Sequence, residues 1–466
     1  MRRNAYTILI SIFYFVGLPG QAQDGYIFTV EDFIQQVKQF HPVAKQASLI
    51  TEKAGADLLS SKGAFDPVLE MNGANKSLDG INYYQYNNSE LKIPTNTGVS
   101  FKAGYERSKG QFINPELTDG VASYLAVELP LLNGLLTDKK RTALLQARLY
   151  RQMSEQERLL MVNDLLLNAY VTYWEWAGAY QLYRVYSGYL QVADKRSRLV
   201  GLSFKNGDRA MADTIEAYTQ FQNYRLLQEQ ALLDLNKKAL DLSLYLWSQQ
   251  EAPYLLPNGY VPDTTHLYSP VPLPDTSLLV TGLQAAHPLL QTGRYKGKIL
   301  EAERKLKFQN LLPVVNLQAN LLSKDYFLYK NFSFIYLQNN YKFGIQARVP
   351  LWLRQGRGEY KAVKLKIKEN DLELARKAWE LQTKVRKYYT EAVQLREQIK
   401  TATEMYVSYK ALLKTEELKF AQGESSLFLI NARENKLLEI QQKLIELQVK
   451  YQQSVHSIEW ASGFIH

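Results

Sequence analysis

The side chains able to do acid–base or metal chemistry are scattered through this sequence. Five histidines, at positions 41, 266, 287, 456 and 466, never occur at the spacing of metal ligands. His41 and His287 each precede a proline, which indicates a helix kink rather than a metal site. No glycine-rich phosphate loop or G-x-S-x-G motif is present, and no pattern pairs two carboxylates in an apolar pocket. We therefore expect no enzymatic activity, no cofactor and no metal site.

Charged residues do gather beside two glycines. Asp208 and Arg209 follow Gly207, and Glu424 follows Gly423. Charged rings at a constriction can gate a pore or select ions, whereas charges on exposed helix faces usually form ion pairs with one another. Both interpretations stay open for these residues.

Two long proline-free stretches must position these glycines. They run from Asp138 to about Val200 and from Gly358 to about Phe420, with apolar residues recurring at three- and four-residue spacing. About 63 residues at about 1.5 Å each predict a helix of roughly 95 Å. Such a helix cannot bury its own apolar stripe, so it must pack along other helices.

The order of elements occurs twice along the chain. His41 and Pro67 recur 246 positions later as His287 and Pro313. In both halves a helix precedes strands, a long helix, a glycine turn and a return helix, which indicates an internal duplication. We divide the chain into a signal peptide (1–23), a first structural repeat (24–250), a proline-rich extended linker (251–276) and a second structural repeat (277–466).

Strands are predicted between the short and the long helices. Apolar and polar residues alternate over residues 99–105, 121–127, 315–321 and 341–349. A further candidate strand at about residues 83–93 would pair with residues 99–107 around the turn at 94–98. Whether this extra pair adds to the main set of strands or forms a surface hairpin stays open. One interpretation is a sheet half-buried on a core. The other places the apolar face against lipid and the polar face in a water-filled lumen. Open sheet edges are not tolerated in lipid, so in the second case the strands must close with strands of other copies.

Composition limits the compartment and the partners. Met1 to Arg3 is basic and is followed by an apolar segment, which is typical of a secretory signal peptide. The absence of cysteine excludes disulfides, thiolate metal sites and a lipid-bearing N-terminal cysteine. A net charge of +10 would permit nucleic-acid binding, but 56 basic residues are interleaved with 46 acidic ones. This pattern indicates solvated helix faces, so we expect no nucleic-acid partner.

Local motifs at the element boundaries carry a family resemblance. Pro130-Leu-Leu-Asn-Gly134 and Pro350-Leu-Trp-Leu-Arg-Gln-Gly356 follow the last strand of each repeat. The turns that end in Gly207 and Gly423 have related sequences, Phe-Lys-Asn-Gly and Phe-Ala-Gln-Gly. In this duplicated order, the chain resembles the TolC family of outer-membrane efflux proteins.

The resemblance implies a mainly α fold with a transmembrane β part. Duplicated long helical hairpins would form a trimeric α-barrel in the periplasm, topped by a 12-stranded β-barrel in the outer membrane with four strands per protomer. Pro130, Gly134, Pro350 and Gly356 would lie at the strand-to-helix joints. Gly207, Asp208, Arg209, Gly423 and Glu424 would lie at the periplasmic tip, as contacts to an adaptor or as an aperture.

The implied function is a passive exit duct of a tripartite efflux or type I secretion system. Its partners would be two further copies, outer-membrane lipid, a periplasmic adaptor protein and an inner-membrane transporter of the RND, ABC or MFS type. The alternative is a periplasmic or secreted coiled-coil adaptor or scaffold without pore activity. Adaptors ordinarily have one helical hairpin between β-rich segments, so the whole-chain duplication favours the duct.

Overall fold

The computed structural model describes residues 26–114, 116–268, 271–273, 275–324 and 340–463. The signal peptide expected at residues 1–23 lies outside them. The chain forms two compact units. The tip unit comprises residues up to 36, 172–270 and 402–449, and the sheet unit comprises residues 37–171, 271–401 and 450 onward. Each unit therefore contains parts of both halves of the sequence.

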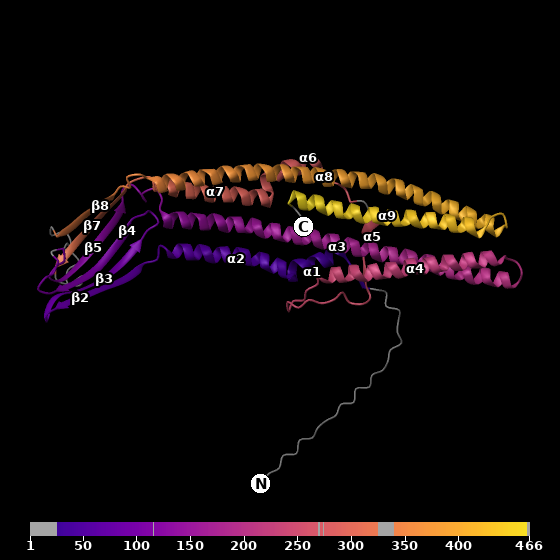
Figure 1. Ribbon diagram of the computed structural model, residues 1–466, viewed down its shortest axis with the longest axis horizontal. Coiled ribbons are helices and arrows are strands. Elements are labelled where there is room, and N and C mark those ends of the chain that lie inside the picture. Colours follow the sequence, from indigo (N-terminus) through magenta and orange to yellow (C-terminus); the bar gives the residue numbers. More distant parts are fainter. Residues whose placement is uncertain (1–25, 115, 269–270, 274, 325–339, 464–466) are drawn as a thin grey trace, which may run out of the picture. The chain divides into compact units, whose positions relative to one another are not determined.

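Two long helices have residues in both units. They are α3 (Lys139–Lys205) with 67 residues and α8 (Arg354–Ala421) with 68. At about 1.5 Å per residue each is roughly 100 Å long, which confirms the prediction from the apolar spacing. Each is followed by a return helix, α4 (Met211–Ser243) after α3 and α9 (Leu427–Ser462) after α8 (Figure 1).

Short helices precede the strands in both halves. They are α1 (Val30–Phe40) and α2 (Pro42–Gly63) in the first, and α6 (Thr276–Ala286) and α7 (Pro288–Gln309) in the second. The expected kink is a complete break. The Nδ1 atoms of His41 and His287 each accept a hydrogen bond from the backbone N–H two residues later, at 3.2 and 3.1 Å. Each histidine thus caps the next helix, whose first residue is the proline.

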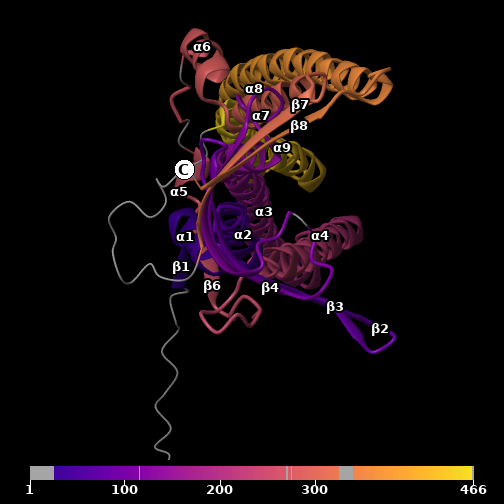
Figure 2. The same ribbon diagram turned by 90° about the vertical axis from the view of Figure 1, so that its left-hand side faces the viewer.

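The strands form one antiparallel sheet of six among the described residues. Its order is β2 (Val68–Leu78), β3 (Ile81–Pro94), β4 (Ser100–Lys109), β5 (Gly120–Pro130), β7 (Val314–Lys324) and β8 (Tyr341–Arg348). The sheet has two strands more than the four per protomer that the resemblance implied, because the first half contributes two hairpins instead of one. Figure 2 shows β2 and its turn at one edge of this sheet.

The proline-rich segment is more ordered than the extended linker we expected. It contains β6 (Tyr260–Pro262), which pairs in parallel with β1 (Tyr26–Phe28), and the short helix α5 (Thr265–Tyr268). The hydroxyl of the buried Tyr173 donates to the carbonyl of Phe28 at 2.8 Å and accepts from the backbone N–H of Asp263 at 3.2 Å. Tyr173 therefore fixes this segment against α3 within the tip unit.

Each unit has its own core of buried residues, and the core of the tip unit combines the two halves of the chain, whereas the cluster in the sheet unit comes from the second half. In the tip unit a buried cluster contains Tyr186, Ala193, Tyr224, Ala231 and Leu438. In the sheet unit another contains Leu283, Leu290, Leu381, Val385 and Ala461. Among the described helices, none has a stretch of residues long and apolar enough to cross a lipid bilayer.

Candidate functional site

One face of the six-stranded sheet carries a row of apolar residues that runs from edge to edge. Directly opposed residues on neighbouring strands share a face. The pairing register therefore places one residue from each strand in a single row: Leu69, Leu91, Ala103, Leu125, Leu321 and Tyr341. The side chains at the two ends of the row are 69% and 68% exposed. An exposed apolar surface of this extent marks a site of interaction.

The opposite face carries a network of charged and polar side chains. The Nζ atom of Lys102 on β4 lies 3.6 Å from a carboxylate oxygen of Glu90 on β3 and 3.3 Å from one of Glu128 on β5. The hydroxyl of Tyr124 on β5 donates to Glu90 at 2.7 Å. The sheet thus has one face suited to lipid and one suited to water, as the alternation predicted.

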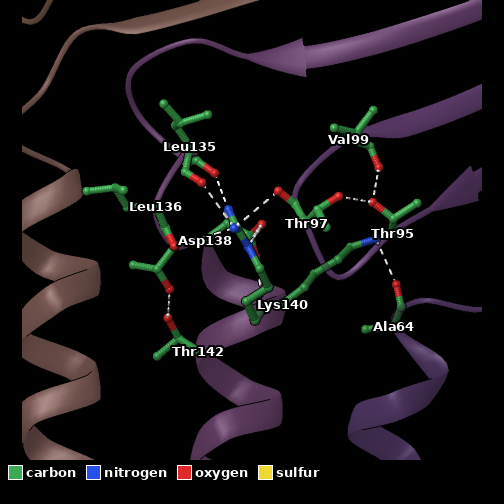
Figure 3. Close-up of polar contacts among 12 residues, drawn as sticks. Ala64, Thr95, Thr97, Val99, Leu135, Leu136, Asp138, Lys140 and Thr142 are labelled. Atoms are coloured by element: carbon green, nitrogen blue, oxygen red, sulfur yellow. Dashed lines mark hydrogen bonds and ion pairs between the residues drawn. The ribbon is translucent and has the colours of Figure 1, made fainter.

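The first strand-to-helix joint is organised by Arg141 at the start of α3. Pro130 ends β5, and Gly134 adopts a left-handed φ of 92° in the loop that follows. The guanidinium of Arg141 donates to the carbonyls of Gly134 and Leu135, and its Nε is 2.9 Å from Asp138 (Figure 3). The positively charged guanidinium of Arg141 therefore stabilises the joint by donating hydrogen bonds to several backbone carbonyls.

The second joint lies beside the first. Pro350 and Gly356 line a cavity of about 290 Å³ together with Asn133 from the first joint. Gly356 is buried, and a Cβ atom there would approach Leu311 to 3.0 Å and the carbonyl oxygen of Asn310 to 3.2 Å. The four joint residues from the sequence pattern thus lie at the helical end of the sheet. At position 356 only glycine fits without displacing Leu311 and the backbone of Asn310.

The predicted tip residues form two matching turns in the tip unit. Gly207 between α3 and α4 has a φ of 84°, and Gly423 between α8 and α9 has a φ of 82°. In each turn the N–H of the residue after the glycine donates to the carbonyl five residues earlier, at 2.9 Å. This is the hydrogen bond of a Schellman motif, in which glycine supplies the left-handed residue after the helix.

Charged side chains at these turns differ in their surroundings. Asp208 and Glu424 are exposed. The guanidinium of Arg209 lies 4.4 Å from the ring centroid of Phe420, so a cation–π contact joins the first turn to the second. Large apolar side chains are also exposed around the turns: Leu202, Phe204, Met211, Leu418, Phe428 and Leu429.

The sequence interpretation missed a buried ion pair that joins the two halves within the tip unit. Arg196 of α3 donates to both carboxylate oxygens of Glu434 on α9, at 2.8 and 2.5 Å. The hydroxyl of Tyr224 on α4 lies 3.3 Å from the same carboxylate, and burial raises the pKa of this tyrosine. A signal was available, because Arg196 and Glu434 both interrupt apolar stripes at helical spacing.

Arg141 was missed for a different reason. It is one of several basic residues at the start of the long helix, and only the folded loops bring the carbonyls to it. The sequence does not show which of the neighbouring basic residues Lys139, Lys140 and Arg141 meets these carbonyls, and Lys139 is exposed.

Comparison with known proteins supplies a family for part of the chain. Residues 279–463 match the model of the outer membrane efflux protein family. A comparison with curated protein sequences found no match.

Solved structures resemble almost the whole chain in fold. CusC, described in connection with transmembrane channel formation, has a TM-score of 0.66 at 14% identity, covering 97% of this chain and 95% of that one. The CmeC outer membrane channel of Campylobacter jejuni has a TM-score of 0.63 at 14% identity, with coverages of 93% and 85%. The open MtrE outer membrane channel of Neisseria gonorrhoeae has a TM-score of 0.64 at 13% identity, with coverages of 93% and 89%. The family match over residues 279–463 and the likeness in fold over nearly the whole length confirm the resemblance of this chain to the TolC-type outer-membrane efflux proteins.

Proposed function

We propose that this chain is the outer-membrane exit duct of a tripartite efflux or type I secretion system. It is a passive conduit for substrates that an inner-membrane transporter and a periplasmic adaptor deliver. The observation that carries the proposal is the sheet with an exposed apolar face and a charged opposite face. A soluble adaptor or scaffold would leave this apolar face in water, which is unfavourable.

The duct is a homotrimer, with the sheet in the outer membrane and the helices in the periplasm. Within one chain the sheet is open at β2 and at β8, whose residues are all exposed. Unpaired backbone groups at an edge are costly in lipid, so the edges pair with other copies to close a β-barrel. The long helices of the three copies enclose the periplasmic part of the conduit and bury their remaining apolar stripes against one another.

The helix tips contact the periplasmic adaptor and face the inner-membrane transporter, of the RND, ABC or MFS type. Exposed apolar side chains next to the turns, including Phe204, Leu418 and Phe428, are suited to helix packing. In the trimer Asp208, Arg209 and Glu424 line the aperture, where their charges bias the passage of ions.

Similar solved structures support the same function. CmeC and MtrE are both described as outer membrane channels. We assign no enzymatic activity to the chain, because transport energy is supplied by the inner-membrane partner.

Cell fractionation followed by native mass determination tests this function. We expect the protein to resist release by osmotic shock, to be extracted from the outer membrane by detergent, and to have the mass of three chains. A monomer released by osmotic shock without detergent would overturn the duct and favour the periplasmic scaffold.

A further inference from the structure

We propose that all six strands form the channel wall, so that the β2–β3 hairpin faces lipid and the edge of β2 pairs with β8 of a second copy. The proposal rests on the proposed function and specifies the surface through which copies assemble. Three copies of a six-stranded sheet give a barrel of eighteen strands instead of the twelve implied by the resemblance. Because barrel diameter grows roughly linearly with strand number, the lumen is about half as wide again.

The register of the sheet supports a continuous wall. The apolar row starts at Leu69 on β2 and continues through Leu91 on β3. From there it crosses β4, β5, β7 and β8, the four strands predicted from the alternation of apolar and polar residues. A second row contains Ile93 on β3 and then Phe101, Val127, Ala319 and Phe343. A hairpin lying in water beyond the wall would have no reason to continue these rows on the same face.

The polar face is continuous as well. Glu90 on β3 contacts Lys102 on β4 and Tyr124 on β5, and the Nζ atom of Lys92 on β3 lies 3.7 Å from Glu128 on β5. These side chains tie β3 to the two strands beyond it. Separating β3 from β4 would leave the partly buried Lys102 and Glu90 without this contact.

The hairpin is also fixed at the helical end of the sheet. The turn between β3 and β4 spans Thr95 to Val99, and the guanidinium of Arg141 donates to the carbonyl of Thr97 at 3.3 Å (Figure 3). The residue before it, Lys140, donates to the carbonyl of Ala64 at 2.9 Å, just after α2 and before β2. Two neighbouring residues at the first joint thus hold both ends of the additional hairpin.

An even number of strands keeps the closed wall antiparallel. Successive strands alternate in direction across the sheet, so β2 and β8 at its edges run in opposite directions. The β8 edge of one copy can therefore pair with the β2 edge of the next as another antiparallel pair. Both edges are fully exposed and are suited to this contact.

Cysteine cross-linking in outer membranes tests the proposal, since the chain has no cysteine of its own. Asn72→Cys on β2 is combined in turn with Lys342→Cys, Gly344→Cys or Gln346→Cys on β8, all on the polar face. Within one chain these positions lie on opposite edges of the sheet, so a disulfide between them joins two copies. We expect at least one pair to give dimers and trimers on a non-reducing gel.

A matched series replaces the β2 position with Glu106→Cys on β4. A twelve-stranded wall, from which the hairpin is displaced, brings β4 next to β8 of the neighbouring copy. Cross-links from position 106 but not from position 72, in a trimer that conducts ions, would overturn the six-strand wall and leave the duct intact. The absence of both trimer and conductance would instead contradict the proposed function.

Labelling of adjacent positions gives an independent readout. Leu69→Cys lies on the apolar face of β2 and Glu70→Cys on the polar face. We expect a water-soluble thiol reagent to modify position 70 readily and position 69 at least tenfold more slowly, with the β8 pair Phe343→Cys and Lys342→Cys as the reference. Equal reactivity at positions 69 and 70, with the β8 pair still unequal, would show that the hairpin lies in water.

Discussion

Arg196 and Glu434 form a bidentate ion pair that joins the two halves of the chain inside the tip unit. The guanidinium is 17% exposed and the carboxylate 4%. The Nη1 atom of Arg196 also lies 3.3 Å from the side-chain oxygen of Asn431. A charge this far from water depends on its partner, because burial without a counter-charge is costly.

Removal of one partner of this pair should destabilise the protein strongly. Glu434→Ala leaves a guanidinium largely buried without a counter-charge, and we expect a loss of about 3 kcal/mol in the free energy of unfolding. Chemical unfolding in detergent measures it. The exposed pair Arg225–Glu229 on α4 is the control, and Glu229→Ala should cost less than about 1 kcal/mol. Equal effects of the two substitutions would contradict the stabilising role of the buried pair.

Stability should fall in mild acid because of His287. Burial lowers the pKa of this histidine to about 4, whereas an unfolded histidine has a pKa of about 6.5. Between these values the unfolded state binds more protons, so stability decreases as the pH falls. The loss from pH 7 to pH 5 is roughly 2 kcal/mol. His287→Asn retains a side-chain acceptor for the helix cap and should remove this part of the pH dependence. An unchanged pH profile in the variant would contradict the assignment.

The glycines of the tip turns should be required for stability because of their backbone conformation, and not because a side chain would clash. A Cβ atom added at Gly207 or Gly423 would meet no other atom within 4 Å, yet both residues have a left-handed φ. Alanine at either position should therefore cost about 1 kcal/mol. Gly201 inside α3 is the control, since alanine there should stabilise the helix by about 0.5–1 kcal/mol. Thermal unfolding of the three variants compares them, and unchanged or increased stability of Gly207→Ala and Gly423→Ala would refute this interpretation of the turns.

Arg141 should be essential for the first strand-to-helix joint. Arg141→Lys keeps the charge but cannot reach several carbonyls at once. We expect the turn at residues 95–99 to become sensitive to protease and the protein to lose about 2 kcal/mol or more in its free energy of unfolding. The exposed neighbour provides the control, because Lys139→Ala should change neither property. Protease resistance equal to that of the original protein would show that Arg141 does not hold the joint.

Much of this fold could be predicted from local sequence patterns. The long helices were found because apolar residues recur at helical spacing over more than 60 positions. Strands β4, β5, β7 and β8 were found from alternation. Strand β2 was missed because Asn72, Gly73 and Asn75 weaken the alternation and favour turns. Its partner β3 sets its register, and that information is not local.

The remaining features depend on contacts between distant residues. The pairing of β6 with β1 joins segments more than 200 residues apart, so the prolines alone suggested an extended linker. The positions of Gly207 and Gly423 at turns were predictable because glycine favours a left-handed φ. The surroundings of Arg141 were not, because its acceptors are backbone carbonyls that carry no sequence signal.

Substitutions that remove the negative charges at the tips should change the ion selectivity of the channel. In the proposed trimer Asp208→Asn combined with Glu424→Gln removes two carboxylates per chain from the aperture, so the preference for cations should decrease. The reversal potential under a salt gradient in a planar bilayer measures this preference. Glu229→Gln, on an exposed helix face, is the control. Unchanged selectivity and conductance in the double variant would assign these charges to solvated helix faces instead.

Single-channel recording tests the exit duct most directly. Detergent-purified protein is added to a planar lipid bilayer at constant voltage, and the current is followed over time. We predict discrete, stable conductance steps that appear one at a time as trimers insert. Folded protein that incorporates into the bilayer and produces no steps would contradict the exit duct.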